Sequence, residues 1–304
     1  IAANATNLGK ADEVFVESGG ADVTVAQAES IQNLSGYDAG GSEFNITDNS
    51  AAVISATDSV LTDGNIHVDV TNTVGASDGA ILNSFSADID FTVSDDAADI
   101  AAEVMGASNA ATDLDDAEAV IVESGAAVDV DQAAAIQGIS GYVGTMSDID
   151  ISDDAAALIS AGDAVLNAEG VDYIRVNGFG TDGYSVNASD GAILNSFSAD
   201  IDFTVSDDAA DIAAEVMGAS NAATDLDDAQ SVVVLSGDAV TVEEAEAIQG
   251  ISGYTGAGDL DIEDTAAALI SAGDTVLNQT GVDHVKASDS SVLANVGAQL
   301  NGFT

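Results

Sequence analysis

Clusters of aspartate are the residues in this sequence whose type and spacing could do chemistry. The segment TDLDDA occurs twice and places three carboxylates within four residues each time: Asp113, Asp115 and Asp116, then Asp225, Asp227 and Asp228. Carboxylate oxygens are hard ligands of the kind that Ca²⁺ prefers. The sequence therefore predicts calcium sites at these two segments. The alternative interpretation is a solvated acidic turn that only caps or solubilises the chain.

A second pattern of carboxylates, D-x-D-I-x-D, is a weaker candidate for metal binding. It comprises Asp148, Asp150 and Asp153, and again Asp259, Asp261 and Asp264. Asp148 and Asp150 would share one face of a strand, whereas the third aspartate more simply begins a helix. Neither the EF-hand loop nor the glycine-rich nonapeptide of calcium β-rolls occurs. The calcium prediction therefore rests on charge and clustering alone.

The remaining chemistry-bearing residues favour a protein that is not an enzyme. The chain has no cysteine, and His67 and His284, its only histidines, lie in strand-like segments that predict exposed strand histidines. No nucleophile-elbow, zinc-protease or phosphate-loop motif occurs. A polysaccharide-processing enzyme remains an alternative, and it would need a cleft of carboxylates found in one repeat only.

Two short motifs have both a structural and a functional interpretation. The tripeptide SGY recurs at Ser35–Tyr37, Ser140–Tyr142 and Ser252–Tyr254. It predicts a tight turn at glycine with a covering tyrosine, and carbohydrate stacking on the tyrosines is the alternative. N-x-S/T sequons occur at Asn4, Asn33, Asn45, Asn187 and Asn278. Most such matches arise by chance in a chain rich in serine and threonine, and glycosylation is the alternative.

The charge of the chain excludes several partners. Its 304 residues include 54 acidic and three basic side chains (Lys10, Arg175 and Lys286), for a net charge of −51. Nothing here can neutralise nucleic-acid phosphates, and no polybasic or long apolar segment predicts membrane binding or insertion. The self-repulsion predicts stabilisation by cations. Adaptation to high salt is an alternative reason for the acidity.

An internal duplication is the strongest pattern in the sequence. Ser77–Ala117 recurs as Ser189–Ala229, a shift of 112 residues. The pattern predicts three repeat units, at residues 1–99, 100–211 and 212–304, with the first starting and the last ending within a repeat. We therefore expect this stretch to belong to a longer array.

Each repeat reads as strands alternating with short helices. DIDFTV and AVIV predict strands, with Ser94 as N-cap of a helix that ends at Gly106. Capping-box spacing marks a second helix three times, at Thr24/Gln27, Asp129/Gln132 and Thr241/Glu244, and this helix ends near Gly138. The predicted fold is α/β, a repetitive solenoid of stacked β-strand/α-helix coils with a parallel sheet. A closed doubly wound domain is the second choice.

The phrases SDDAADIAAE, DTAAALISAGDTVLN and VTVEEAEAIQGISGY resemble tandem units of large repetitive acidic bacterial extracellular proteins, namely surface-layer, filament and adhesin repeat arrays. The resemblance implies secretion, calcium-aided folding and a place at the cell surface. It predicts a structural protein of an extracellular filament, sheath or surface layer that self-associates into a polymer or layer, with cell-surface polysaccharide as a further partner. The alternative is the repeat stalk or binding region of a calcium-dependent bacterial adhesin.

Overall fold

The structure, a computed structural model, describes residues 12–17, 22–63, 65–106, 114–177, 185–218, 226–291, 297 and 299. It divides into two compact units, residues 1–150 with 168–172 and residues 151–167 with 173–304. This division differs from the three repeat units, which the sequence alone defines.

Short helices and short strands alternate along the first unit. Its helices are α2 (Val25–Gln32), α3 (Ser50–Ser55), α4 (Asp58–Leu61), α5 (Ala76–Asn83), α6 (Ala97–Gly106) and α7 (Val130–Gln137), with 3-10 turns η2 (Ala39–Gly41) and η3 (Gly144–Met146). Its strands are β1 (Glu43–Asp48), β2 (Asn65–Val70), β3 (Ile89–Asp90), β4 (Thr92–Asp96), β5 (Ala119–Glu123) and the start of β6 (Ile149–Asp153).

The second unit continues the same alternation. Its helices are α8 (Ala155–Ala161), α9 (Asp163–Leu166), α10 (Ala188–Asn195), α11 (Ala209–Gly218), α12 (Val242–Gln249), α13 (Ala266–Ala272) and α14 (Asp274–Leu277). Its strands are the end of β7 (Val171–Val176), β8 (Ser185–Val186), β9 (Ile201–Asp202), β10 (Thr204–Asp208), β11 (Ser231–Leu235), β12 (Tyr254–Gly258), β13 (Leu260–Asp264) and β14 (Val282–Ala287). Among the described helices, none has the length and apolar character needed to cross a membrane.

The sheets are parallel, and their strand order largely follows the chain. The orders are β1-β2-β3, β4-β5, β6-β7-β9, β8-β10-β11-β12 and β13-β14. In the first unit Glu43 pairs with Asn65, and in the second unit Thr204 pairs with Ser231. Parallel neighbours need a crossover connection, and here short helices supply most of it. The predicted α/β class with parallel sheets is therefore confirmed.

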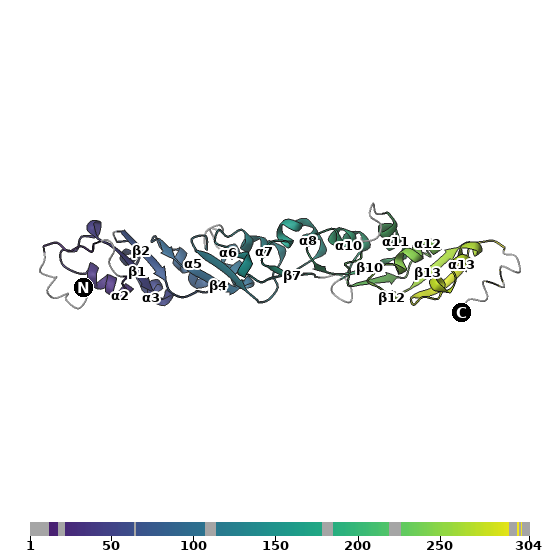
Figure 1. Ribbon diagram of the computed structural model, residues 1–304, viewed down its shortest axis with the longest axis horizontal. Helices are drawn as coiled ribbons and strands as arrows, with labels where there is room; N and C mark the ends of the chain where they lie inside the picture. Colours follow the sequence, from purple (N-terminus) through teal and green to yellow (C-terminus); the bar gives the residue numbers. More distant parts are fainter. Residues whose placement is uncertain are drawn as a thin grey trace. The chain divides into compact units, whose positions relative to one another are not determined.

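The helices of each unit pack on one another and on the strands. In the first unit α5 contacts α6 and α6 contacts α7, while in the second unit α10, α11 and α12 follow one another beside β10 and β12 (Figure 1). Among the described residues, the core between helices and strands consists of aliphatic side chains with three phenylalanines, Phe44, Phe91 and Phe203. Val93, Ile100 and Phe91 are almost fully buried, and so is Phe203.

The local signals for the second helix of each repeat are confirmed. Thr24 accepts a hydrogen bond from the backbone N–H of Gln27 at 3.3 Å, and the Gln27 side chain accepts one from the Thr24 N–H at 2.9 Å. The same reciprocal box begins α7 and α12. Gly138 is the C-cap of α7, as predicted.

The predicted N-cap of α6 is wrong. Strand β4 pairs with β5 through Asp96, so the chain is still extended beyond Ser94. The Ser94 hydroxyl donates to Glu123 at 2.6 Å instead. The carboxylate of Asp96 accepts the N–H of Asp99 at 2.9 Å and caps the helix. Strand pairing, which depends on a segment remote in sequence, moved the helix start by two residues.

Glycine inside two helices reflects close packing. A Cβ atom at Gly79 of α5 would lie 2.8 Å from Val93 Cγ2, and one at Gly191 of α10 would lie 2.8 Å from Val205 Cγ2. Such contacts are too short for any side chain. The glycines therefore let these helices approach the strands closely, despite the low helix propensity of glycine.

Candidate functional site

Aspartates at strand ends accept hydrogen bonds from the helix that precedes them in the chain. Asp95 Oδ2 accepts the N–H of Ala76 at 2.9 Å, and its Oδ1 accepts the N–H of Asp96 at 3.0 Å. Its copy Asp207 accepts the N–H of Ala188 at 2.9 Å. Ala76 and Ala188 are the first residues of α5 and α10. Each carboxylate thus satisfies a backbone group that the helix itself leaves free.

The same contact occurs at two further strand ends. Asp48 of β1 accepts the N–H of Val25 at 3.1 Å, and Asp264 of β13 accepts the N–H of Val242 at 3.1 Å. The positive end of a helix favours an anion at this place. These carboxylates connect successive helix–strand segments, so part of the chain's acidity has a structural use.

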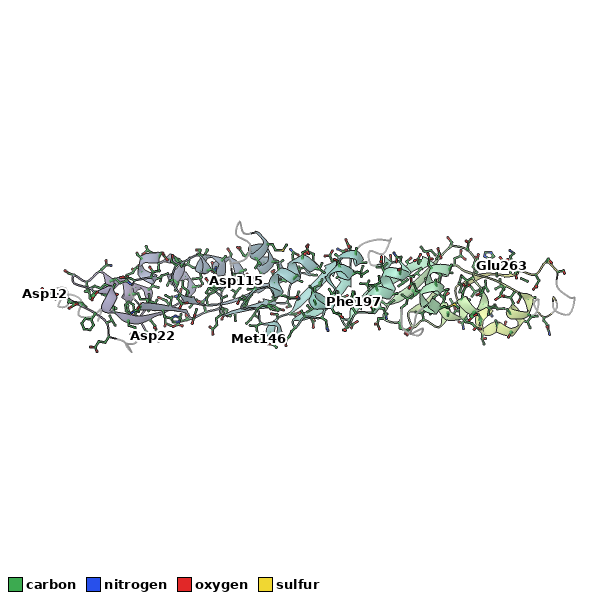
Figure 2. All side chains as sticks on the ribbon, turned by 90° about the horizontal axis from the view of Figure 1, so that it is seen from above. Asp12, Asp22, Asp115, Met146, Phe197 and Glu263 are labelled. Carbon is green, nitrogen blue, oxygen red and sulfur yellow. The ribbon has the colours of Figure 1, made fainter. Side chains whose placement is uncertain are left out.

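The predicted calcium segments lie in turns before β5 and β11. Asp113 and Asp225 fall outside the described residues. Asp115 (Figure 2) accepts the backbone N–H of Ser140 at 3.3 Å, and Asp227 accepts that of Ser252 at 3.2 Å.

The two remaining aspartates of these segments contribute backbone groups. Asp116 and Asp228 donate their N–H groups to Asn83 and Asn195, at 2.9 and 2.8 Å. The described groups of clustered ligands include none of these four aspartates. Calcium binding at the TDLDDA segments therefore stays a prediction.

The structure brings other carboxylates together. Five groups have ligand atoms within 4.8 Å of one another: Asp148, Asp150 and Asp172; Asp259, Asp261, Asp283 and His284; His67, Asp69 and Asp90; Asp95, Asp96 and Asp99; Asp207, Asp208 and Asp211. The first two groups contain the first two aspartates of each D-x-D-I-x-D segment. These aspartates lie close to side chains of the neighbouring strand, which are Asp172 in the first group and Asp283 and His284 in the second. The third aspartates of these segments, Asp153 and Asp264, lie outside these groups at strand ends.

The groups at the helix starts are occupied by backbone donors. Asp208 accepts the N–H of Asp211 at 3.0 Å, and Asp207 accepts that of Asp208 at 2.9 Å. The nearby charges of Asp208 and then Asp207 raise the pKa of Asp211, which is an exposed side chain. Crowded like charges and capping thus coexist at this helix start.

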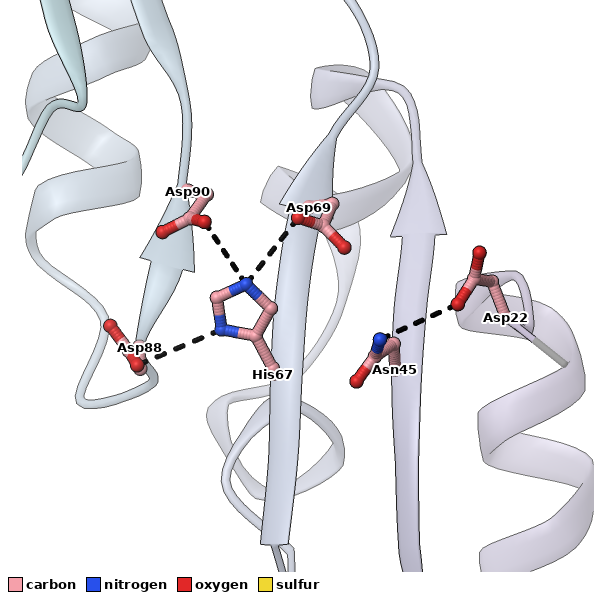
Figure 3. Close-up of polar contacts among 6 residues, drawn as sticks. All are labelled: Asp22, Asn45, His67, Asp69, Asp88 and Asp90. Carbon is pink, nitrogen blue, oxygen red and sulfur yellow. Dashed lines mark hydrogen bonds and ion pairs between the residues drawn. The ribbon is translucent and has the colours of Figure 1, made fainter. Parts of the chain in front are cut away.

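The His67 side chain is surrounded by carboxylates (Figure 3). Its Nε2 lies 3.0 Å from Asp90 Oδ2 and 3.4 Å from Asp69 Oδ1, and its Nδ1 lies 3.7 Å from Asp88 Oδ2. Burial by itself lowers the pKa of His67, but the charges of Asp90 and Asp69 outweigh it and raise that pKa. The carboxylates around His67 therefore favour a positive charge at this place.

His284 on β14 repeats this arrangement. Its Nδ1 lies 3.0 Å from Asp261 Oδ1 and 2.9 Å from Asp283 Oδ2. The hydrogen bond to Asp261, followed by the charge of Asp283, raises the pKa of His284. Two residues on, Lys286 Nζ lies 2.9 Å from Glu263. The histidines do lie on strands as predicted, but sequence reasoning missed their carboxylate partners. The adjacent letters H-V-D and D-H were the available signal.

The SGY turns connect neighbouring segments by hydrogen bonds. The Tyr142 hydroxyl donates to the carbonyl of Glu169 at 2.9 Å. A Cβ atom at Gly141 would lie 2.4 Å from the carbonyl oxygen of Ala117, so only glycine fits. Burial raises the pKa of Tyr142. These contacts support the structural interpretation of SGY.

Two further residues named from the sequence, Asn4 of a sequon and the basic Lys10, lie outside the described residues.

Comparison of the chain with protein-family models, with curated proteins and with solved structures finds no match in any of the three.

Proposed function

We propose that this chain is a stretch of a structural protein of an extracellular filament, sheath or surface layer, folded as a solenoid of stacked strand-and-helix coils. A coil is one passage of the chain from a strand through its helix to the strand that pairs with it. The observation that carries the proposal is this pairing. Val74 pairs with Val93, Thr92 with Ala119, and Thr204 with Ser231, always in parallel.

Sequential pairing favours an open stack over a closed doubly wound domain. A doubly wound sheet reverses its strand order at one point, where it forms a ligand crevice. In the described sheets most paired strands follow one another along the chain, as in β1-β2-β3, and the two exceptions, β7 with β9 and β8 with β10, each skip a single strand. Successive helices also pack on one another, as α5, α6 and α7 do. Coils that contact only their neighbours can be repeated without limit, which suits a polymer.

The strand-end carboxylates support the same proposal. Asp95 and Asp207, which are copies in the duplication, make equivalent bonds to Ala76 and Ala188. An acidic residue at this position therefore belongs to the stacking of coils and recurs with it. The chain has many more acidic side chains than these caps use. Its net charge of −51 therefore calls for screening by cations.

Self-association is tested by electron microscopy of the purified chain, with and without calcium and at low and high salt. The proposal predicts filaments or sheets whose formation depends on cations. Dispersed monomers under all conditions would contradict it.

Thermal melts separate specific calcium binding from charge screening. Stabilisation by millimolar CaCl₂ beyond that of NaCl at equal ionic strength would indicate sites, because a ligand that binds only the folded state stabilises by mass action. Equal stabilisation would limit the role of cations to screening and would remove the calcium sites from the proposal.

A further inference from the structure

The two histidines of the chain occupy equivalent strand positions. His67 of β2 lies opposite Asn45 of β1, and His284 of β14 lies opposite Asp261 of β13. Asn45 and Asp261 each stand three residues before the aspartate that ends their strand. The two histidines therefore occupy the same register position relative to the preceding strand, one histidine in each compact unit.

At both positions a single ring nitrogen faces two carboxylates. His67 Nε2 contacts Asp90 at 3.0 Å and Asp69 at 3.4 Å. His284 Nδ1 contacts Asp261 at 3.0 Å and Asp283 at 2.9 Å. One ring nitrogen carries at most one hydrogen, so it cannot donate a full hydrogen bond to both oxygens. A divalent ion in place of that hydrogen can bind all three atoms and neutralise both carboxylates.

The distances at His67 fit a tetrahedral ion. Zinc bonds to nitrogen and carboxylate oxygen of about 2.0–2.1 Å place tetrahedral ligands about 3.3 Å apart. The separations of 3.0 and 3.4 Å around Nε2 bracket that value. Asp88 lies 3.7 Å from Nδ1, on the far side of the ring (Figure 3).

An unsatisfied oxygen supports the second position. Asp259 belongs to the group formed with Asp261, Asp283 and His284. Its Oδ1 is shielded from solvent and contacts no hydrogen-bond donor among the described residues. A shielded carboxylate oxygen without a partner is costly, and a cation held by the same group would satisfy it.

We propose that the His67 group and the His284 group each bind one divalent transition-metal ion such as Zn²⁺. Imidazole nitrogen suits zinc, whereas Ca²⁺ takes oxygen ligands. At the first site His67 and Asp69 come from β2 and Asp90 from β3, so the ion connects two neighbouring strands. The His67 side chain is 37% exposed and that of His284 73%, so we expect tighter binding at His67. These sites select a different cation from the calcium of the proposed function and require no self-association.

The test is a zinc titration of the metal-stripped full chain, followed by competition with a chromophoric zinc indicator. High NaCl and excess Mg²⁺ suppress binding to the general negative charge. We expect two ions per chain, one after His67→Gln or His284→Gln, and none in the double variant. Asp88→Asn, which removes a nearby carboxylate that is not a ligand of the proposed ion, should keep the count of two. Glu118→Gln, which removes an exposed carboxylate outside both groups, should change nothing.

Cobalt substitution gives an independent readout, because tetrahedral Co²⁺ absorbs strongly in the visible range. His67→Gln alters a half-buried side chain and His284→Gln an exposed one, and circular dichroism checks that both variants fold. An unchanged zinc count in the double variant, or binding that Mg²⁺ abolishes, would overturn the proposal. A chain that binds two zinc ions without forming filaments would contradict only the proposed function.

Discussion

The contact between Asp95 and helix α5 gives the most specific prediction about stability. Asp95→Ala removes the acceptor of the Ala76 N–H at 2.9 Å and of the Asp96 N–H at 3.0 Å. Ala76 is 1% exposed, so water cannot easily replace the lost acceptor. Leaving a buried N–H unpaired costs about 1–3 kcal/mol, and losing a helix cap costs about 0.5–2 kcal/mol. We therefore expect local opening of the α5 start to become easier by about 1–3 kcal/mol.

Hydrogen exchange at single amides measures this change directly, and it does not require the whole chain to unfold in one step. Because about 1.4 kcal/mol corresponds to a tenfold change, the Ala76 amide should exchange about 5- to 150-fold faster in the variant. The measurement belongs in high salt, since the substitution also removes one of the 54 acidic charges and so relieves repulsion.

Glu118→Ala is the matched control. Glu118 is exposed, and its side chain makes no hydrogen bond within the described residues, so the control removes a charge without removing a cap. Unchanged exchange at Ala76 in Asp95→Ala, or equal acceleration in both variants, would refute the capping argument.

Three further predictions concern packing, charge and the helix start. Gly191→Ala gains about 1 kcal/mol of helix propensity but overpacks the core at a cost of about 1–3 kcal/mol, so the urea midpoint should fall; a rise would contradict the close packing. The pKa of Asp211 is raised by its neighbours, so its charge destabilises the fold at neutral pH and this cost disappears as the carboxyl protonates at low pH. Asp211→Asn should therefore raise the melting temperature at pH 7 but not below about pH 4, and an unchanged melt at pH 7 would argue against repulsion. Asp96→Ala should lower the free energy of unfolding by about 1 kcal/mol, because it removes the cap of α6, and Ser94→Ala should lower it by less than about 0.5 kcal/mol. Urea denaturation measures both values, and a larger loss for Ser94→Ala would contradict the assigned cap.

Local sequence was enough to predict features whose partners are close along the chain. The capping boxes depend on residues three apart, such as Asp129 and Gln132, and all three boxes form. The α/β class with parallel sheets followed from strands alternating with short helices. The start of α6 was mispredicted because Asp96 pairs with Glu123, a residue that no local pattern connects to it.

The contacts between strand ends and helices could not be predicted in the same way. Asp95 and Ala76 are 19 residues apart, and their meeting depends on which strand lies beside which. Asp95 directly follows Ser94, the predicted cap of α6, yet it accepts the first N–H of the preceding helix α5. The same reason hid the neighbours of His67, since Asp90 comes from the next strand.

Disulfide trapping tests the stacking of coils most directly, and the absence of native cysteine removes any background. Ser206 pairs with Val233 across β10 and β11, and Leu235 lies two residues beyond that partner. Partners on adjacent strands lie about 4.8 Å apart, within disulfide range, whereas the shifted pair lies about 8 Å apart and outside it. The account predicts rapid cross-linking of Ser206→Cys with Val233→Cys and little with Leu235→Cys. Equal rates for the two pairs, or a preference for the shifted pair, would contradict it.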